Sequence, residues 1–158
     1  MTAPRQAILA LDVGEARIGL ARWTSERDIQ DEGSISRKSL AEDYRRLARI
    51  ISERGVGQIV VGLPLNDDGS AGPQAKRARR FAAGLSRMLA QAAAPGEVVV
   101  TVGLWNEAET TIEATLELGL SGRPLAYRER GLVDSRSAAI ILRRYIAGNA
   151  GSGVRLNS

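Results

Sequence analysis

The sequence contains no cysteine and no histidine. The lack of cysteine excludes disulfides, zinc–thiolate sites and cysteine nucleophiles. Without imidazole, the chain cannot form a Ser-His-Asp triad or a two-histidine metal motif. Any hydrolytic chemistry must therefore depend on carboxylates, on metals bound through oxygen, or on lysine and arginine.

Long apolar segments are also missing, and aromatic residues make up only 4% of the chain. No run approaches the roughly 20 apolar residues that span a bilayer, and the N-terminus lacks the pattern of a signal peptide. We therefore expect a cytoplasmic protein that makes no membrane contact. With 158 residues, 44% hydrophobic and 25% charged, one soluble domain is expected over residues 1–147. Residues 148–158, rich in Gly, Ser and Asn, are expected to form a flexible tail.

Lysine is scarce among the basic residues. Only Lys38 and Lys76 are lysines, and the other 20 of the 22 basic residues are arginines. The planar guanidinium suits bidentate phosphate contacts, so an arginine-rich chain with a net charge of +4 favours nucleic acid as a partner. A genome rich in G+C would also raise the arginine content, and composition leaves both explanations open.

The N-terminal third predicts three strands and a helix. Residues 6–13 and 16–23 are two apolar runs that read as a β-hairpin. A more polar strand within residues 29–36 is expected at or near an edge of the sheet. A capping box at residues 39–42 then begins an amphipathic helix.

The remaining chain alternates strands with helices. Residues 58–63 lack polar alternation, which is typical of a central strand covered on both faces. The expected elements that follow are a polar loop at 65–72, a helix at 73–91, a buried strand at 98–105, a helix at 109–118, a loop at 119–131 and a last helix from 132. This order predicts an α/β fold, in which helices flank a mixed sheet.

The helix at 73–91 is strongly basic. No acidic residue occurs between Asp68 and Glu97, so its bases cannot gain from oppositely charged neighbours one turn away. We expect this face to bind nucleic acid, and the alternative is an ordinary solvated face. The bases concerned are Lys76, Arg77, Arg79, Arg80 and Arg87.

Three carboxylates fall where a predicted element meets its loop. Asp12 ends a buried strand, Glu107 follows another strand, and Asp134 lies near a helix start in line with the apolar stripe. A turn residue at Asp12 and a helix-capping residue at Asp134 are the plain alternatives. If the three converge, their repulsion raises their pKa values unless cations neutralise them. Two Mg²⁺ or Mn²⁺ ions would suit such a site and support hydrolysis at phosphorus.

Three motifs in order resemble the YqgF/RuvX family, over nearly the whole chain. They are Asp12-Val13-Gly14 with Arg17-Ile18-Gly19-Leu20-Ala21, then Val61-Gly62-Leu63-Pro64-Leu65-Asn66 with Asp68-Gly69 and Gly72-Pro73, then Val133-Asp134-Ser135 with Ala138-Ala139-Ile140-Ile141-Leu142. The resemblance implies a ribonuclease H-like fold and a metal-dependent nuclease. It implies action on Holliday junctions or on the 5′ end of pre-16S rRNA, and it maps the acidic triad onto Asp12, Glu107 and Asp134.

The middle motif departs from the family pattern. Asn106 stands where an aspartate is usual, and Ala108 stands where an arginine is usual. An amide at Asn106 can still coordinate a metal as an auxiliary ligand, but without charge. One alternative is therefore a nucleic-acid-binding module of the same fold with weak or lost catalysis. Another is a sugar kinase or actin-like ATPase, but this chain has no room for the second domain that such proteins need.

Further arginines are expected to contact the substrate. Arg17 is expected to touch a phosphate or to clamp the acidic cluster, and Arg128 and Arg130 lie in the predicted loop at 119–131. The substrate is a DNA junction or RNA, which the sequence does not separate. A junction resolvase would act as a homodimer, so that two strands are cut.

Overall fold

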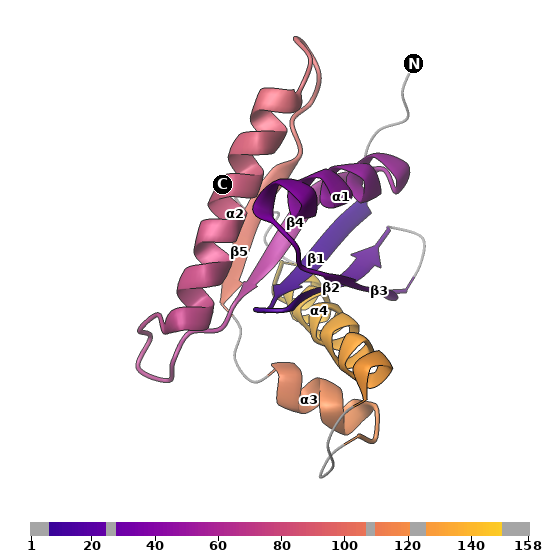
Figure 1. Cartoon of the computed structure of the whole chain (residues 1–158), viewed down its shortest axis with the longest axis vertical. Helices are drawn as coiled ribbons and strands as arrows, with labels where there is room; N and C mark the ends of the chain where they lie inside the picture. The colour runs from indigo at the N-terminus through magenta and orange to yellow at the C-terminus, as the bar shows by residue number, and fades with distance from the viewer. Residues whose placement is uncertain (1–6, 25–27, 107–109, 121–125, 150–158) are drawn as a thin grey trace.

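The fold is a five-stranded sheet with helices on both faces (Figure 1). The computed structural model describes residues 7–24, 28–106, 110–120 and 126–149. None of the helices in these ranges combines the length and the apolar character that crossing a membrane requires. The elements are β1 (Ala7–Val13), β2 (Arg17–Trp23), β3 (Gln30–Ser36), α1 (Leu40–Glu53), β4 (Val56–Leu63), α2 (Pro73–Ala92), β5 (Thr101–Asn106), α3 (Thr110–Glu117) and α4 (Tyr127–Asn149).

The sheet is mixed and has the strand order β3-β2-β1-β4-β5. β1 pairs with β2 antiparallel, and so does β2 with β3, whereas β1, β4 and β5 run parallel. This confirms the hairpin, the edge position of β3 and the inner position of β4. The ends of β1, β4 and β5 and the start of β2 therefore share one border of the sheet, which we call the carboxyl edge.

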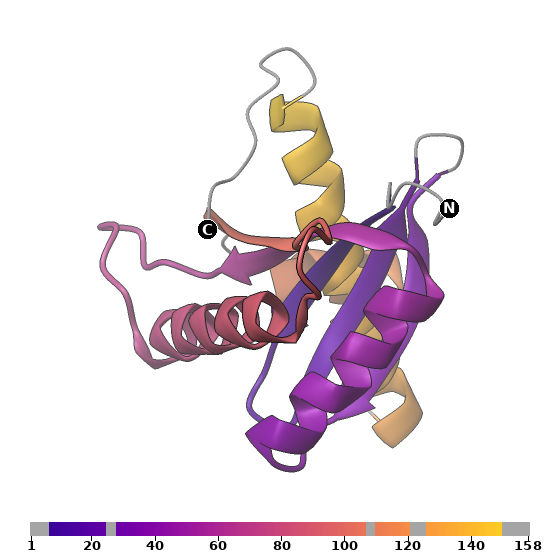
Figure 2. The ribbon, with the colours of Figure 1, turned by 90° about the horizontal axis from the view of Figure 1, so that it is seen from above.

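The two faces of the sheet are packed differently. Large aliphatic side chains of β1 and β4 meet α1 and α2 on one face, and α4 covers the other face (Figure 2). Some strand residues under α4 are small, such as Ala10 and Ala21. A side chain at Gly62 would place its Cβ 2.4 Å from Cδ1 of Ile141. Small residues thus let α4 lie close to the strands, so groups on α4 come near the backbone of the sheet.

The predicted start of the last strand was wrong. The strand expected at 98–105 begins only at Thr101, because the β4–β5 ladder starts with the pair Gln58 and Thr101. Val98 is therefore 82% exposed rather than buried.

The last helix begins at Tyr127 rather than at 132, so the segment expected to be a loop contains the first turn of α4. Glu129 accepts a hydrogen bond from the backbone N–H of Ala126 at 3.0 Å, which is half of a capping box. Arg128 and Arg130 consequently lie on a helix and not in a loop. α4 also extends through Asn149, two residues into the segment expected to be a tail, and 150–158 fall outside the described ranges.

Candidate active site

Asp12 lies near the end of β1, on the face of the sheet that α4 covers. It lies two residues after Ala10, on the same face of the strand, and Ala10 packs in the α4 core. The cross-strand partner of Asp12 in β2 is Gly19. Removal from water raises the pKa of Asp12 to about 7, the charge of Asp134 adds to this rise, and the Ser137 hydroxyl opposes it. A carboxyl that is half protonated at neutral pH marks a position where a cation would be stabilising.

Gly19 explains how a residue of α4 reaches Asp12. A Cβ built on Gly19 would lie 1.9 Å from the backbone oxygen of Asp134. The α4 backbone therefore rests directly on β2, at the residue that pairs with Asp12. Only glycine has room at this point, so a sequence feature far from Asp134 decides where Asp134 sits.

Ser135 fixes the same part of α4 to the sheet. The β2–β3 ladder has an irregularity between Gly19 and Ala21, which leaves backbone groups without ladder partners. The Ser135 hydroxyl donates to the Leu20 carbonyl at 3.1 Å and accepts from the Gly33 N–H at 3.2 Å. One fully buried side chain thus joins α4 to two strands next to Asp134.

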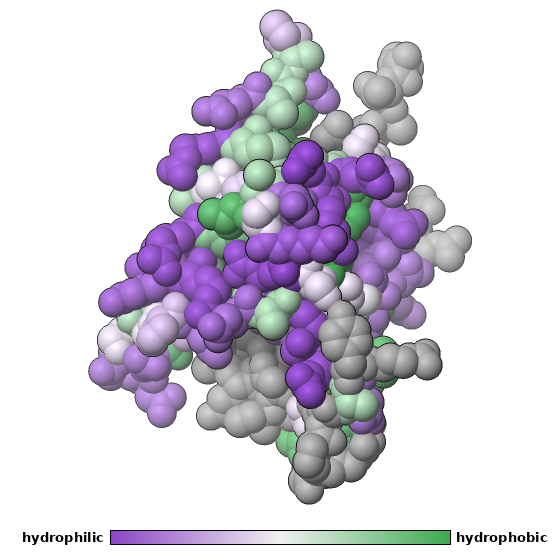
Figure 3. Space-filling model, in the orientation of Figure 1, coloured by the Kyte–Doolittle hydropathy of each residue, from purple (hydrophilic) through white to green (hydrophobic). Residues whose placement is uncertain are grey.

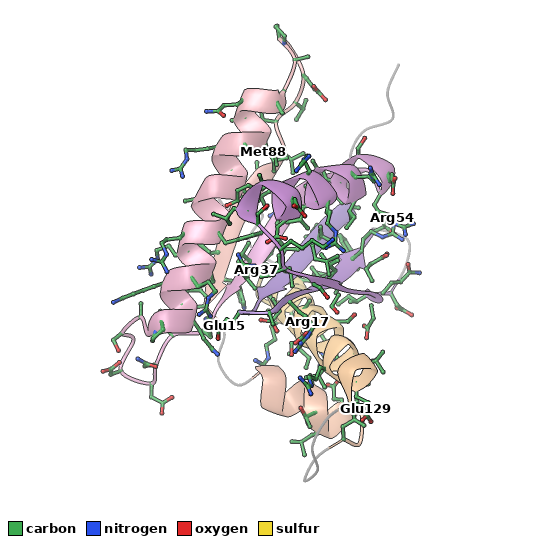
Figure 4. All side chains as sticks on the ribbon, in the orientation of Figure 1. Glu15, Arg17, Arg37, Arg54, Met88 and Glu129 are labelled. Atoms are coloured by element: carbon green, nitrogen blue, oxygen red, sulfur yellow. The ribbon has the colours of Figure 1, made fainter. Side chains whose placement is uncertain are left out.

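Arg17 holds the carboxylate of Asp134. Its Nε donates to Oδ2 at 2.5 Å, and both side chains are about one-fifth exposed. Burial raises the pKa of Asp134, and the hydrogen bond and charge of Arg17 oppose that rise. Figure 4 shows Arg17 at the start of β2, beside the first half of α4. The structure therefore pairs Arg17 with Asp134, one of the three predicted carboxylates.

Ser137 is a site residue that the sequence analysis missed. It lies one turn after Asp134, it is fully buried, and its hydroxyl has no hydrogen-bond partner within the described part of the chain. It is close enough to Asp12 to lower the pKa of that carboxyl. A polar residue three positions after Asp134 in an otherwise apolar stripe was the available signal.

Arg37 braces the hairpin that carries Asp12. Its guanidinium donates to the Gly14 carbonyl at 3.0 Å, pairs with the buried carboxylate of Asp43 at 3.3 Å, and lies over the Phe81 ring. Asp43 also accepts from the Lys38 N–H at 3.0 Å. Figure 4 shows Arg37 between α1, α2 and the hairpin. The turn after Asp12 is thus tied to both helices of that face.

The third predicted carboxylate is not placed by the structure. Glu107 lies outside the described residues. Its neighbour Asn106 ends β5 at the carboxyl edge, is exposed, and pairs with Leu63 of β4. Asp12 and Asp134 come together from β1 and α4, and in the described part of the chain no third acid joins them.

The oxygen donors at this site fit a hard divalent cation. Two carboxylates whose pKa values are raised by burial lie close enough to repel each other, and bound Mg²⁺ or Mn²⁺ relieves such repulsion. The buried, unpartnered Ser137 hydroxyl beside them is a further polar oxygen.

The bases of α2 face away from the core. Lys76, Arg79, Arg80 and Arg87 are exposed and Arg77 is half-buried. In Figure 3, hydrophilic side chains gather over the outer side of this helix. They are therefore accessible, but they do not touch the two carboxylates.

Comparisons with known proteins identify the family. Residues 6–148 match the family described as "RuvX: Holliday junction resolvase". A protein of Synechococcus elongatus named "Putative pre-16S rRNA nuclease" is 35% identical over 144 residues, which cover 90% of each chain. A protein of the same name from Thermoanaerobacter pseudethanolicus is 33% identical over 140 residues, 88% of this chain and 94% of that one.

Among solved structures, Thermus thermophilus RuvC in complex with a Holliday junction substrate is similar in fold. The TM-score is 0.54 at 13% identity, over 93% of this chain and 97% of that chain. This likeness confirms the expected ribonuclease H-like architecture. The family match over residues 6–148 and the relatives of 33–35% identity lead to one conclusion: the chain belongs to the RuvX family of Holliday junction resolvases.

Proposed function

We propose that this protein is a divalent-metal-dependent nuclease that hydrolyses phosphodiester bonds in structured nucleic acid. The observation that carries the proposal is the meeting of Asp12 and Asp134 across Gly19, with both pKa values raised. Membership of a resolvase family and similarity to proteins named as pre-16S rRNA nucleases support it. The substrates that follow are branched or single-stranded DNA, or the 5′ end of pre-16S rRNA.

Asp12 and Asp134 would hold the cation, and we assign Glu107 as the third ligand because it directly follows β5 at the carboxyl edge. Asn106 is a candidate auxiliary ligand. When bound, a pair of Mg²⁺ or Mn²⁺ ions would activate a water and stabilise the leaving oxygen in an in-line displacement.

The surrounding residues keep these ligands in place. Arg17 fixes the carboxylate of Asp134 through Nε, and its other guanidinium nitrogens can then contact a substrate phosphate. Ser135 keeps α4 seated on β2 and β3. Such rigid support is what a site needs to hold its ligands in the reactive geometry.

A nucleic-acid-binding module with weak or lost catalysis is the second candidate. The observation that favours it is the middle motif, in which Asn106 and Ala108 replace an acidic and a basic residue. Loss of one charge at a metal site lowers its affinity for the cation. This candidate predicts that nucleic acid binds equally well with and without divalent metal and is not cut.

The deciding experiment is a substrate panel of junction DNA, single-stranded DNA and a structured precursor RNA, incubated with Mg²⁺ or Mn²⁺ and read at nucleotide resolution. We expect cleavage that Asp12→Asn, Asp134→Asn and Glu107→Gln each abolish while binding is retained. Glu53→Gln is the matched control, because Glu53 is exposed at the far end of α1. Absence of cleavage on every substrate with both metals would refute the proposed nuclease activity.

We also propose a homodimer in the cytoplasm as the working form, because resolution of a junction requires two symmetric cuts. Light scattering of the protein with and without junction DNA tests the stoichiometry. A monomer in both conditions would restrict the proposal to single cuts.

A further inference from the structure

Three basic residues form a straight row on the outer side of α2. Lys76, Arg80 and Arg87 are spaced by four and seven residues, which places them within about 40° of one another around the helix axis. All three are exposed, and they lie opposite the buried residues Ala78 and Leu85. We call these three residues the basic row.

The basic row is not neutralised by its surroundings. Other arginines, such as Arg22 with Glu32, are held in ion pairs, but in the described part of the chain no carboxylate pairs with any base of the row. The N-cap of α2, Gly72, has no side chain to cap the helix, and no acid lies in the first turn. The positive end of the helix dipole therefore adds to the charge of the row.

The direction of α2 relates the row to the two carboxylates. β4 ends at the carboxyl edge, and α2 begins beside that edge and runs away from it (Figure 1). In Figure 4, Met88 marks the far end of α2, whereas Glu15 and Arg17 mark the edge. With a rise of 1.5 Å per residue, the row extends for about 16 Å away from the site. A nucleic-acid strand that leaves the site along α2 would meet Lys76, Arg80 and Arg87 one after another.

The chemistry of the basic row fits the phosphates of a nucleic acid rather than its nucleobases. The outward positions of α2 hold no aromatic side chain on which a base could stack, so contacts would be electrostatic and independent of base sequence. A single row on a convex helix can follow one backbone, whereas a duplex presents two backbones that curve away from a straight line. This favours one flexible strand.

We propose that the basic row binds the phosphates of a single-stranded flank, on one side only of the phosphate that is cut. The proposal rests on the nuclease function above, and it adds the strandedness and the asymmetry of the substrate. A substrate would need about three nucleotides of single strand on that side.

Binding is measured first, by fluorescence anisotropy of labelled single strands in EDTA, so that no cleavage is required. Arg80→Ala with Arg87→Ala is compared with Arg45→Ala with Arg49→Ala, which removes two exposed charges from the neighbouring α1. We expect the α2 variant to raise Kd about tenfold and to lower the slope of log Kd against log salt by about 1.4, since each phosphate contact on a single strand contributes about 0.7. Equal losses of affinity in both variants would overturn the proposal. So would a larger loss of affinity for duplex than for single strands in the α2 variant.

Cleavage kinetics then test the asymmetry. Substrates shortened stepwise on either side of the cut should show a higher KM when one side falls below about three nucleotides, with kcat little changed. The α2 variant should lose this dependence on length. The proposal is contradicted if shortening either side of the substrate raises KM equally. It is also contradicted if KM still depends on length in the α2 variant. If the wild-type protein cuts nothing, the nuclease proposal fails, and the anisotropy measurement still decides whether the row binds single strands.

Discussion

Asp12→Asn should make the metal-free protein more stable while abolishing its activity. The pKa of Asp12 is raised from 3.8 to about 7, so the folded state holds this proton more tightly than the unfolded chain does. Between about pH 4 and pH 7 the folded state therefore binds more protons, and its stability falls as the pH rises through this window. A pKa shift of this size lowers the free energy of unfolding of the metal-free protein by about 4 kcal/mol at pH 8.

In Asp12→Asn an uncharged amide replaces the carboxyl, so the free-energy cost of ionising a buried carboxyl is absent at every pH. Because Asp12 as a residue is half-buried rather than fully buried, we expect about half of the full figure, about 2 kcal/mol. This raises Tm by about 4 to 8 °C in a chain of this length. The assay is thermal unfolding in EDTA at pH 8 and at pH 4, where the carboxyl is protonated in the folded wild-type protein and the gap should nearly close. Mg²⁺ or Mn²⁺ should then stabilise the wild-type protein but not the variant. A gap that is absent at pH 8, or equal at both pH values, would refute the assigned burial and the repulsion by Asp134.

Four further variants test the frame of the site. Gly19→Ala places a Cβ against the Asp134 carbonyl; we expect a loss of about 3 kcal/mol in urea unfolding and a loss of cleavage, and near wild-type stability would contradict the close approach. Ser135→Ala leaves the Leu20 carbonyl and the Gly33 N–H unpaired and should cost about 2 kcal/mol. Ser137→Ala should cost less, under about 0.5 kcal/mol, because the Ser137 hydroxyl interacts only weakly, with the Asp12 carboxyl. Equal costs would be inconsistent with these contacts. Asp43→Ala strands the Arg37 guanidinium and should lower the free energy of unfolding by about 3 kcal/mol, with a smaller effect meaning that the pair does not brace the hairpin.

The order and pairing of the elements were largely readable from the sequence. The hairpin of β1 and β2 follows from two apolar runs joined by a short turn, and β4 follows from a run without alternation. These patterns report burial, which is a local consequence of where each face points. The start of α4 was not readable, because Gly131 in its first turns is a typical helix breaker, whereas here a bulkier residue would approach the Ser34 hydroxyl.

The candidate site was only partly readable. Asp12 and Asp134 were predicted because a carboxylate in an apolar run needs a compensating partner. The roles of Gly19 and Ser135 depend on the contact of α4 with an irregular stretch of β2 and β3, which no periodicity in one segment can reveal. Glu107 stays a prediction, and so do the contacts of Lys76, Arg77, Arg79, Arg80, Arg128 and Arg130 with nucleic acid.

The seating of α4 on β2 also has a consequence for synthesis of the protein. Arg17 and its partner Asp134 are 117 residues apart in the sequence, so the two halves of the site emerge from the ribosome at opposite ends of translation. A nascent or prematurely terminated chain has the hairpin and its aspartate but not the helix that carries Asp134. The proposed cation site therefore forms only after the final helix has docked, and an unfinished chain lacks it.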